Sequence, residues 1–125
     1  MLAVIDYGMG NLKSVKNAVE ALSEEVLLTR DPAEIERADG IILPGVGAFG
    51  EGMQNLEEFG LVDVLNKEVI EKKKPYLGIC LGLQFLARTG FEDGEKSGLG
   101  WVEGDVKLMK PEGDFKIPHM GWNNV

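Results

Sequence analysis

Four short apolar runs, separated by segments of a different periodicity, constrain the fold of this chain more than any other feature. Each run is rich in aliphatic and β-branched side chains, as strands buried on both faces of a parallel sheet are. The runs occupy residues 2–5, 26–29, 40–43 and 75–79. Helical spacing or a helix-start signal marks residues 12–22, 33–38, 56–73 and 81–88. This alternation predicts a three-layer α/β fold with a mostly parallel sheet and helices on both faces.

The details of the pattern predict three further features. Gly60 predicts a break within the helical segment 56–73. The basic run 72–74 at the end of that segment is expected to be a solvated helix end. Beyond Gly90 the pattern changes, and residues 99–102 and 105–109, separated by a Glu-Gly pair, predict a β-hairpin.

Composition excludes several classes of function. The 125 residues are 44% hydrophobic and 27% charged, which is typical of one soluble globular domain. The net charge of −8 repels phosphate backbones, so we expect no nucleic-acid partner. No apolar run approaches the length of a membrane span, and the first residues lack the pattern of a signal peptide, so we expect no membrane association. A single cysteine cannot form an internal disulfide, and this favours a reducing, cytoplasmic setting.

That cysteine, Cys80, lies between Gly78 and Gly82 at the junction of a predicted strand and a predicted helix. The Gly-x-Cys-x-Gly pattern is the cysteine form of a nucleophile elbow. Such a turn forces strained backbone angles on the nucleophile and places the sulfur at a helix N-terminus, where the helix dipole favours the thiolate. The N–H of Leu81 would then point to where an oxyanion forms. The local pattern also fits a buried structural thiol, so both interpretations stay open.

Two more glycine-rich turns follow predicted strands and should meet Cys80 at the same edge of the sheet. PGVGAFG, at residues 44–50, offers a second oxyanion donor from Val46 or Gly47. DYGMGN, at residues 6–11, lacks the third glycine of a dinucleotide fingerprint and the Gly-Lys-Ser/Thr of a P-loop. A tight turn is therefore favoured there over a phosphate site.

These segments resemble a known family. GICLGLQ is similar to the nucleophile segment of class I, triad-type glutamine amidotransferases, and PGVGAFG to their oxyanion strand. DYGMGNLKS near the start and PHMGWN at residues 118–123 narrow the resemblance to the glutaminase subunits of imidazole glycerol phosphate synthase, from histidine biosynthesis. The resemblance runs essentially from the first residue to the last, and it implies a flavodoxin-like sheet.

The resemblance implies a mechanism without metal or organic cofactor. Cys80 would attack the side-chain amide of glutamine, ammonia would leave, and water would hydrolyse the thioester to glutamate. Val46, Gly47 and Leu81 would be the oxyanion donors. Gly45 and Gln84 would help to hold the glutamine.

The resemblance also implies a partner, a (β/α)8-barrel cyclase subunit that receives the ammonia in a heterodimer. The residues expected to lie toward the cyclase are Tyr7, Asn11, His119, Met120, Trp122 and Asn123. Trp122 is the expected anchor, since tryptophan is enriched among residues that dominate interface energetics.

The chain departs from the family in one respect. The triad histidine and glutamate of the family lie on a later segment, and His119, the one histidine here, does not match the triad base. We therefore expect residues 1–125 to be the N-terminal portion of a single amidotransferase domain, incomplete at the C-terminus, with little turnover alone. Such a portion is also expected to expose apolar sheet surface and a bare sheet edge.

Three alternatives remain at this point. One is another class I amidotransferase, such as the glutaminase of a vitamin B6 synthase. The second is a non-catalytic module that docks a barrel partner, supported by the missing triad base and acid. The third is a flavodoxin-like cofactor carrier, against which the Gly-x-Cys-x-Gly elbow argues.

Overall fold

A computed structural model describes residues 1–114, 116–118, 120–122 and 124, and its centre is a four-stranded parallel sheet. The strand order is β2-β1-β3-β4, and every pair is parallel. The strands are β1 (Leu2–Ile5), β2 (Val26–Thr29), β3 (Gly40–Gly45) and β4 (Tyr76–Cys80). The predicted α/β class with a parallel sheet is therefore confirmed, and all four strands lie where the apolar runs predicted them.

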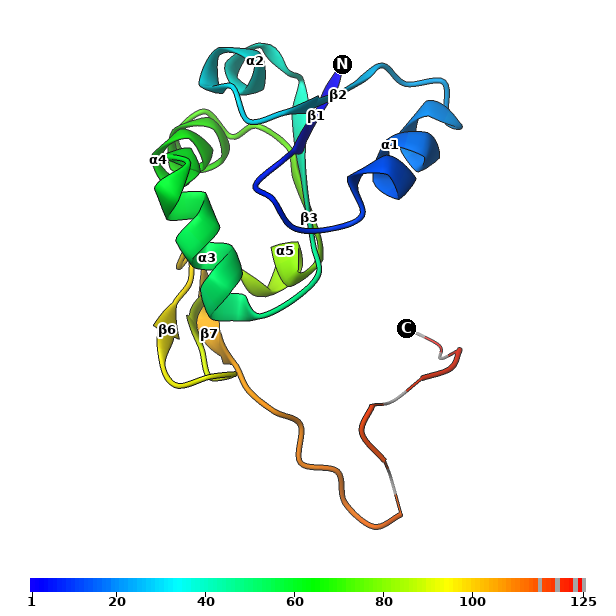
Figure 1. Ribbon diagram of the computed structural model, residues 1–125, viewed down its shortest axis with the longest axis vertical. Coiled ribbons are helices and arrows are strands. Elements are labelled where there is room, and N and C mark those ends of the chain that lie inside the picture. The colour runs from blue at the N-terminus through cyan, green and yellow to red at the C-terminus, as the bar shows by residue number, and fades with distance from the viewer. Residues whose placement is uncertain (115, 119, 123, 125) are drawn as a thin grey trace.

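Helices cover both faces of this sheet (Figure 1). They are α1 (Leu12–Glu20), α2 (Pro32–Arg37), α3 (Phe49–Glu58), α4 (Leu61–Leu65), a π-helical segment η1 (Asn66–Glu71) and the single turn α5 (Leu81–Gln84). Alternation along the strands divides the core, because successive side chains point to opposite faces. Val4 and Ile42 pack against Val19 of α1, whereas Ala3 and Leu43 join the larger core under α2 to α5.

The helix starts and breaks follow local chemistry. Asp31 caps α2 by accepting a hydrogen bond of 2.8 Å from the Ala33 N–H, and Pro32 occupies the first turn, as predicted. Gly60 separates α3 from α4 in the left-handed conformation, with φ of +67°, which confirms the predicted break. The helix before that break begins at Phe49, upstream of the predicted start, because glycines with poor helix propensity obscured its first turn in the sequence.

A second, three-stranded sheet with strand order β6-β5-β7 corrects the prediction for the C-terminal half. Its strands are β5 (Ala87–Gly90), β6 (Lys96–Ser97) and β7 (Val102–Val106). The predicted helix 81–88 is wrong beyond Gln84, and the predicted hairpin is also wrong because Glu103 and Gly104 lie inside one continuous strand. That strand pairs with β5 in parallel, Ala87 opposite Val102, so pairing between distant segments outweighs the local turn signal.

The basic run at the end of η1 is less solvated than predicted. Lys74 is 10% exposed and pairs with the buried Glu68 at 2.8 Å. Lys72 reaches the other carboxylate oxygen of Glu68 at 2.9 Å. Burial acts to raise the pKa of Glu68, but its interactions with the Lys74 and Lys72 ammonium groups outweigh this and hold the pKa below its ordinary value. The run therefore neutralises a buried charge.

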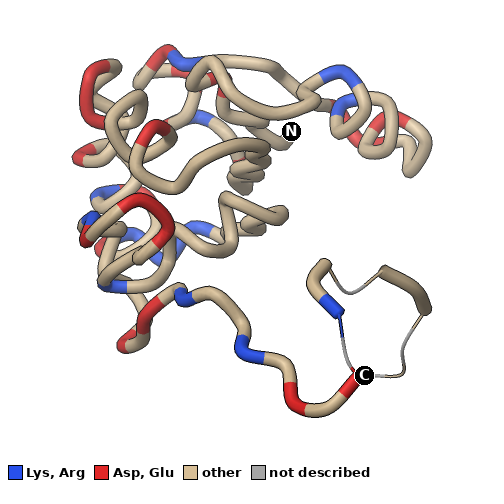
Figure 2. Tube along the Cα trace, turned by 60° about the horizontal axis from the view of Figure 1, so that its bottom comes forward, with Lys and Arg blue, Asp and Glu red and all other residues tan. Residues whose placement is uncertain are grey.

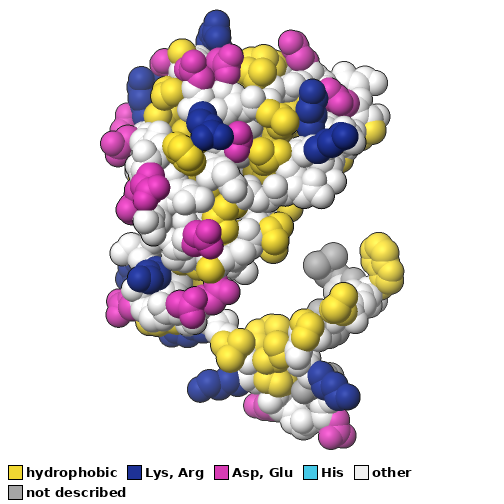
Figure 3. Space-filling model, in the orientation of Figure 1, with side chains coloured by type: hydrophobic (Ala, Val, Ile, Leu, Met, Phe, Trp, Pro, Cys, Tyr) yellow, Lys and Arg dark blue, Asp and Glu magenta, His cyan; other side chains and the backbone are white. Residues whose placement is uncertain are grey.

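Apolar surface is exposed along β4, as expected. β4 is the last strand of its sheet, and in the part of the chain that the structure describes no strand covers its outer edge. Leu77 is 55% exposed and Ile79 38% exposed. Beyond β7 the described residues form an extended tail that leads away from the sheets and carries hydrophobic side chains, among them Met120 and Trp122 (Figures 1 and 3).

Charged residues are distributed over the helices and loops, with lysines and arginines interleaved among the acidic side chains (Figure 2). Within the described residues, no helix combines the length and the apolar character that crossing a membrane would require.

Candidate active site

Cys80 ends β4 and stands in a strained turn. Its backbone has φ of +53° and ψ of −111°, outside the regions that residues other than glycine ordinarily occupy. The strain predicted for a nucleophile elbow is therefore confirmed. Cys80 is also exposed, so the buried structural thiol is no longer an adequate interpretation.

The two glycines beside Cys80 allow the chain to pack closely on both sides of the turn. A Cβ on Gly82 would collide with the carbonyl oxygen of Leu43 in β3. A Cβ on Gly78 would lie 2.5 Å from the Gly82 oxygen. The Tyr76 hydroxyl donates a hydrogen bond of 2.8 Å to that same oxygen. The glycine spacing is thus a packing requirement of the strand-to-turn junction.

The helix that follows is shorter than predicted. α5 is a single turn, and the Phe85 N–H closes it by donating to the Leu81 carbonyl. A dipole builds up as peptide units align, so one turn contributes less to the site than the predicted longer helix would.

PGVG, the start of the second glycine-rich turn, lies beside the elbow. Gly45 pairs with Cys80 in the register of β3 and β4. Gly47 has φ of +122°, a conformation that favours glycine, and it lines the same cleft as Cys80. Val46 is exposed on this turn. The sequence prediction that the two turns meet is confirmed, while the roles of Val46 and Gly47 as oxyanion donors stay predictions.

The cleft at Cys80 has a volume of about 370 Å³, which suits a small metabolite. Gly47, Leu81 and Gln84 line it with Cys80, so the structure brings together the predicted nucleophile, two predicted oxyanion donors and one predicted substrate-binding residue. The other lining residues come from the end of β7 and from the segments that follow β5 and β7, namely Phe91, Glu92, Val106, Lys107 and Leu108. Sequence reasoning missed that second wall because it depends on the second sheet.

Glu92 corrects the sequence interpretation most directly. Its loop looked like an ordinary solvated acidic segment, yet Glu92 lines the cleft and also accepts a hydrogen bond of 2.8 Å from the Phe49 N–H. Ala48, the N-cap residue of α3, offers no side-chain acceptor, and Glu92, 43 residues after Phe49, supplies the cap instead. The sequence signal for this contact was the start of α3, because Ala48 cannot cap the helix and a distant acceptor is therefore needed.

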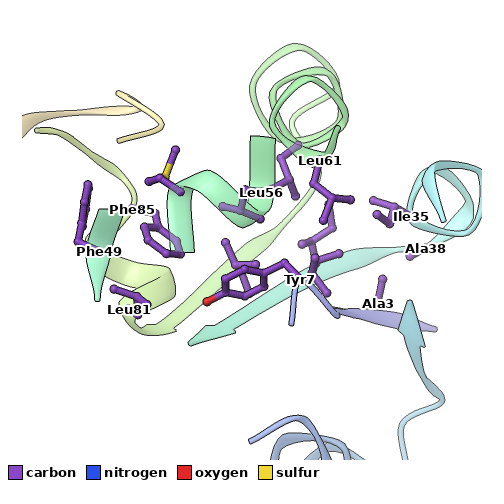
Figure 4. Packing of buried hydrophobic residues seen from close by; sticks show 14 residues of the cluster. Ala3, Tyr7, Ile35, Ala38, Phe49, Leu56, Leu61, Leu81 and Phe85 are labelled. Carbon is purple, nitrogen blue, oxygen red and sulfur yellow. The ribbon is translucent and has the colours of Figure 1, made fainter. Parts of the chain in front are cut away.

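Tyr7 lies in the core and not on the predicted partner surface. Its side chain is fully buried, and its ring meets the Phe85 ring edge-on with centroids 6.0 Å apart. Figure 4 places it among the packed side chains, together with Phe49 and Leu81. Burial raises the pKa of the Tyr7 hydroxyl, and the nearby Cys80 raises it further. A side chain without exposed surface cannot contact a partner in this arrangement.

The other residues expected at a partner surface fall into two groups. Asn11 is exposed and caps α1 by accepting a hydrogen bond from the Ser14 N–H, and Met120 and Trp122 are strongly exposed on the tail. His119 and Asn123 lie outside the described residues. The structure therefore leaves the partner surface a prediction.

Comparisons with known proteins agree with this geometry. The family model described as glutamine amidotransferase class-I matches residues 3–123. A relative from Methanococcus maripaludis, described as imidazole glycerol phosphate synthase subunit HisH 2, is 49% identical over 100% of this chain and 61% of its own length. A relative from Aquifex aeolicus, described as imidazole glycerol phosphate synthase subunit HisH, is 54% identical over 98% of this chain and 58% of its own.

Solved structures agree on the fold. A crystal structure of a glutamine amidotransferase has a TM-score of 0.68 at 23% identity, covering 82% of this chain and 54% of that one. At 23% identity this similarity supports the fold and says nothing about activity. The chain spans 61% and 58% of the length of the two curated relatives above.

Proposed function

Because the chain belongs to the class I glutamine amidotransferase family, we propose that it carries the nucleophile half of a glutaminase that releases ammonia for imidazole glycerol phosphate synthesis. The observation that carries the proposal is the strained, exposed Cys80 in register with Gly45 of the PGVG turn. The relatives described as HisH subunits support the choice of pathway.

The proposed reaction uses groups on both turns. The Cys80 sulfur attacks the side-chain carbonyl carbon of glutamine, the carbon–nitrogen bond breaks, and ammonia leaves with a proton from solvent or from a proton-transfer group. Water then hydrolyses the thioester, which returns the sulfur and releases glutamate. Backbone N–H groups of Leu81 and of Val46 or Gly47 would stabilise the oxyanion. No cofactor is needed for these steps.

Proton transfer limits what these residues do alone. Among the described residues that line the cleft, only Cys80, Glu92 and Lys107 carry an ionisable side chain, and none of them is a histidine. We propose that efficient turnover needs a base other than the described residues that line the cleft. The same observation favours a second candidate function, a docking module that holds a barrel partner without hydrolysing glutamine.

We also propose a heterodimer with a (β/α)8-barrel cyclase in the cytoplasm. Support comes from the subunit names of the relatives and from the exposed apolar side chains on the tail, with Trp122 as the anchor.

A diazoketone analogue of glutamine tests the proposed function. It should add once to the chain, at Cys80, as measured by intact mass and peptide mapping, and Cys80→Ala should not react. The D-enantiomer is the matched control, since it carries the same electrophile without the substrate's stereochemistry. If iodoacetamide labels Cys80 while the diazoketone does not, the site binds no glutamine and the docking module is favoured.

Glu92 gives a sharper test of substrate recognition. Its carboxylate lines the cleft and is the described anionic group there that could accept the α-ammonium of an amino acid. Glu92→Gln should slow labelling by the diazoketone about 5- to 10-fold, as loss of an exposed charged contact does, and leave labelling by iodoacetamide within about 2-fold. The amide keeps an oxygen for the Phe49 N–H. Asp93→Asn, which changes the neighbouring charge, is the control, and equal slowing in both variants would contradict recognition by Glu92.

A further inference from the structure

The Tyr7 hydroxyl is a buried hydrogen-bond donor that packing of the fold alone does not account for. The side chain is 0% exposed, and its oxygen has no hydrogen-bond partner among the residues that the structure describes. Leaving a polar group buried and unpaired disfavours the folded state, so such groups call for a specific explanation. A phenylalanine would fill the same space without that penalty.

The hydroxyl lies directly behind the elbow. A Cβ placed on Gly45 would collide with the Tyr7 oxygen, and that same Cβ would lie 2.8 Å from the Cβ of Leu81. Gly45 pairs in register with Cys80. Figure 4 shows the oxygen of the Tyr7 ring directed toward Leu81 at the start of α5. The donor is therefore held between the nucleophile turn and the PGVG turn.

Acceptors at this position are few. The Gly82 carbonyl already accepts the hydroxyl of Tyr76. Leu81 and Phe85, which pack beside Tyr7, present apolar side chains. The group across the turn that gains negative charge during the proposed reaction is the sulfur of Cys80, the register partner of Gly45. Tyr7 stays protonated throughout the range in which a thiol ionises, so it remains a donor.

We propose that Tyr7 is a positioning residue for the nucleophile, whose hydroxyl donates a hydrogen bond to the Cys80 sulfur once the thiol has lost its proton to solvent. The bond is not made in the present arrangement, and it forms when the ionised sulfur turns toward the donor. It would hold the sulfur beside the PGVG turn and favour the thiolate. The inference rests on the proposed function only in taking Cys80 as the nucleophile.

The test compares Tyr7→Phe with the unaltered chain by the rate of iodoacetamide alkylation at Cys80, measured against pH by mass spectrometry. Alkylation follows the thiolate, so the profile reports the ionisation of Cys80. Glu92 and Lys107, which line the cleft, and Tyr76, behind the turn, are the same in both proteins and cancel in the comparison. In Tyr7→Phe the midpoint should move to higher pH, and the rate at pH 7 should fall about 3- to 10-fold.

Thermal unfolding supplies the second measurement, and Tyr76→Phe is the matched control. Tyr76→Phe removes a hydroxyl with a partner and should lower the unfolding midpoint, whereas Tyr7→Phe removes one without a partner and should leave the midpoint unchanged or higher. An unchanged alkylation profile in Tyr7→Phe overturns the proposal. A drop in its unfolding midpoint equal to that of Tyr76→Phe also overturns it, because the hydroxyl would then have a structural partner.

Failure of the two proposals can be told apart. Iodoacetamide does not need a glutamine site, whereas the diazoketone does. A shifted profile in Tyr7→Phe without diazoketone labelling would support the role of Tyr7 and remove the glutaminase. Diazoketone labelling with an unshifted profile would support the glutaminase and overturn the role of Tyr7.

Discussion

Gly82→Ala is expected to lower the free energy of unfolding by about 3 to 4 kcal/mol, because the added methyl group would collide with a backbone carbonyl and not with a movable side chain. That carbonyl belongs to Leu43, a fully buried residue of β3. Relief would require β3 and α5 to separate, which would disturb both turns of the site. Urea unfolding followed by the fluorescence of Trp101, whose indole donates a hydrogen bond to Asn66, would measure the loss.

Gly104→Ala is the matched control. Gly104 lies within β7, has no atoms near the position of an added Cβ, and is not in the left-handed conformation. Its substitution should change the free energy of unfolding by less than about 0.5 kcal/mol. If both alanines had equally small effects, the close contact of α5 with β3 would be disproved.

Lys74→Met is expected to lower the free energy of unfolding by about 2 to 3 kcal/mol, because it leaves the Glu68 carboxylate with one ammonium group in place of two. Removing one partner of an enclosed pair costs about 3 to 5 kcal/mol, and we expect less here because Glu68 is covered by lysine side chains near the surface. Lys67→Met is the control, since Lys67 is half exposed and, among the residues that the structure describes, pairs with Glu36 alone, at 3.4 Å.

The pH dependence follows from the lowered pKa of Glu68. A carboxylate with a lower pKa in the folded state stabilises the fold above its ordinary value, near 4.5, and loses that contribution as pH falls through the folded pKa. In Lys74→Met the folded pKa rises, so acid unfolding followed by circular dichroism should depend less on Glu68. Glu68→Leu combined with Lys74→Met should recover much of the lost stability. No recovery would mean that Lys74 stabilises the fold mainly through the hydrogen bonds that it donates to the Ile35 and Glu36 carbonyls.

The parallel sheet and the elbow could be predicted from the sequence because both depend on residues close together in the chain. Aliphatic and β-branched runs marked all four strands of the first sheet. The spacing of Gly78, Cys80 and Gly82 indicates a tightly packed turn, and this can be recognised without knowing which strands and helices pack against it. The meeting of the elbow with PGVG then followed from strand direction alone.

The second sheet could not be predicted in this way. The predicted helix 81–88 runs into residues 87 and 88, and only pairing with β6 and β7, which are distant in the sequence, makes residues 87–90 a strand. Glu92 joins the cleft because that sheet exists, and its bond to Phe49 spans 43 residues. The sequence prediction placed Tyr7 on the partner surface for a different reason. A turn motif indicates that the backbone reverses, but not whether a side chain points outward or into the core.

The interlocked glycines at the elbow also bear on how such a site can diverge. Cys80 is exposed and lines an open cleft, so its side chain can change with little steric consequence for the surrounding chain. Gly82 cannot be replaced in this way, because a Cβ would collide with the Leu43 carbonyl, although Gly82 takes no part in the proposed reaction. A descendant of this scaffold could therefore abandon glutamine chemistry and keep its turns. The persistence of the glycine spacing in a homologue would indicate a shared ancestor more reliably than a shared activity.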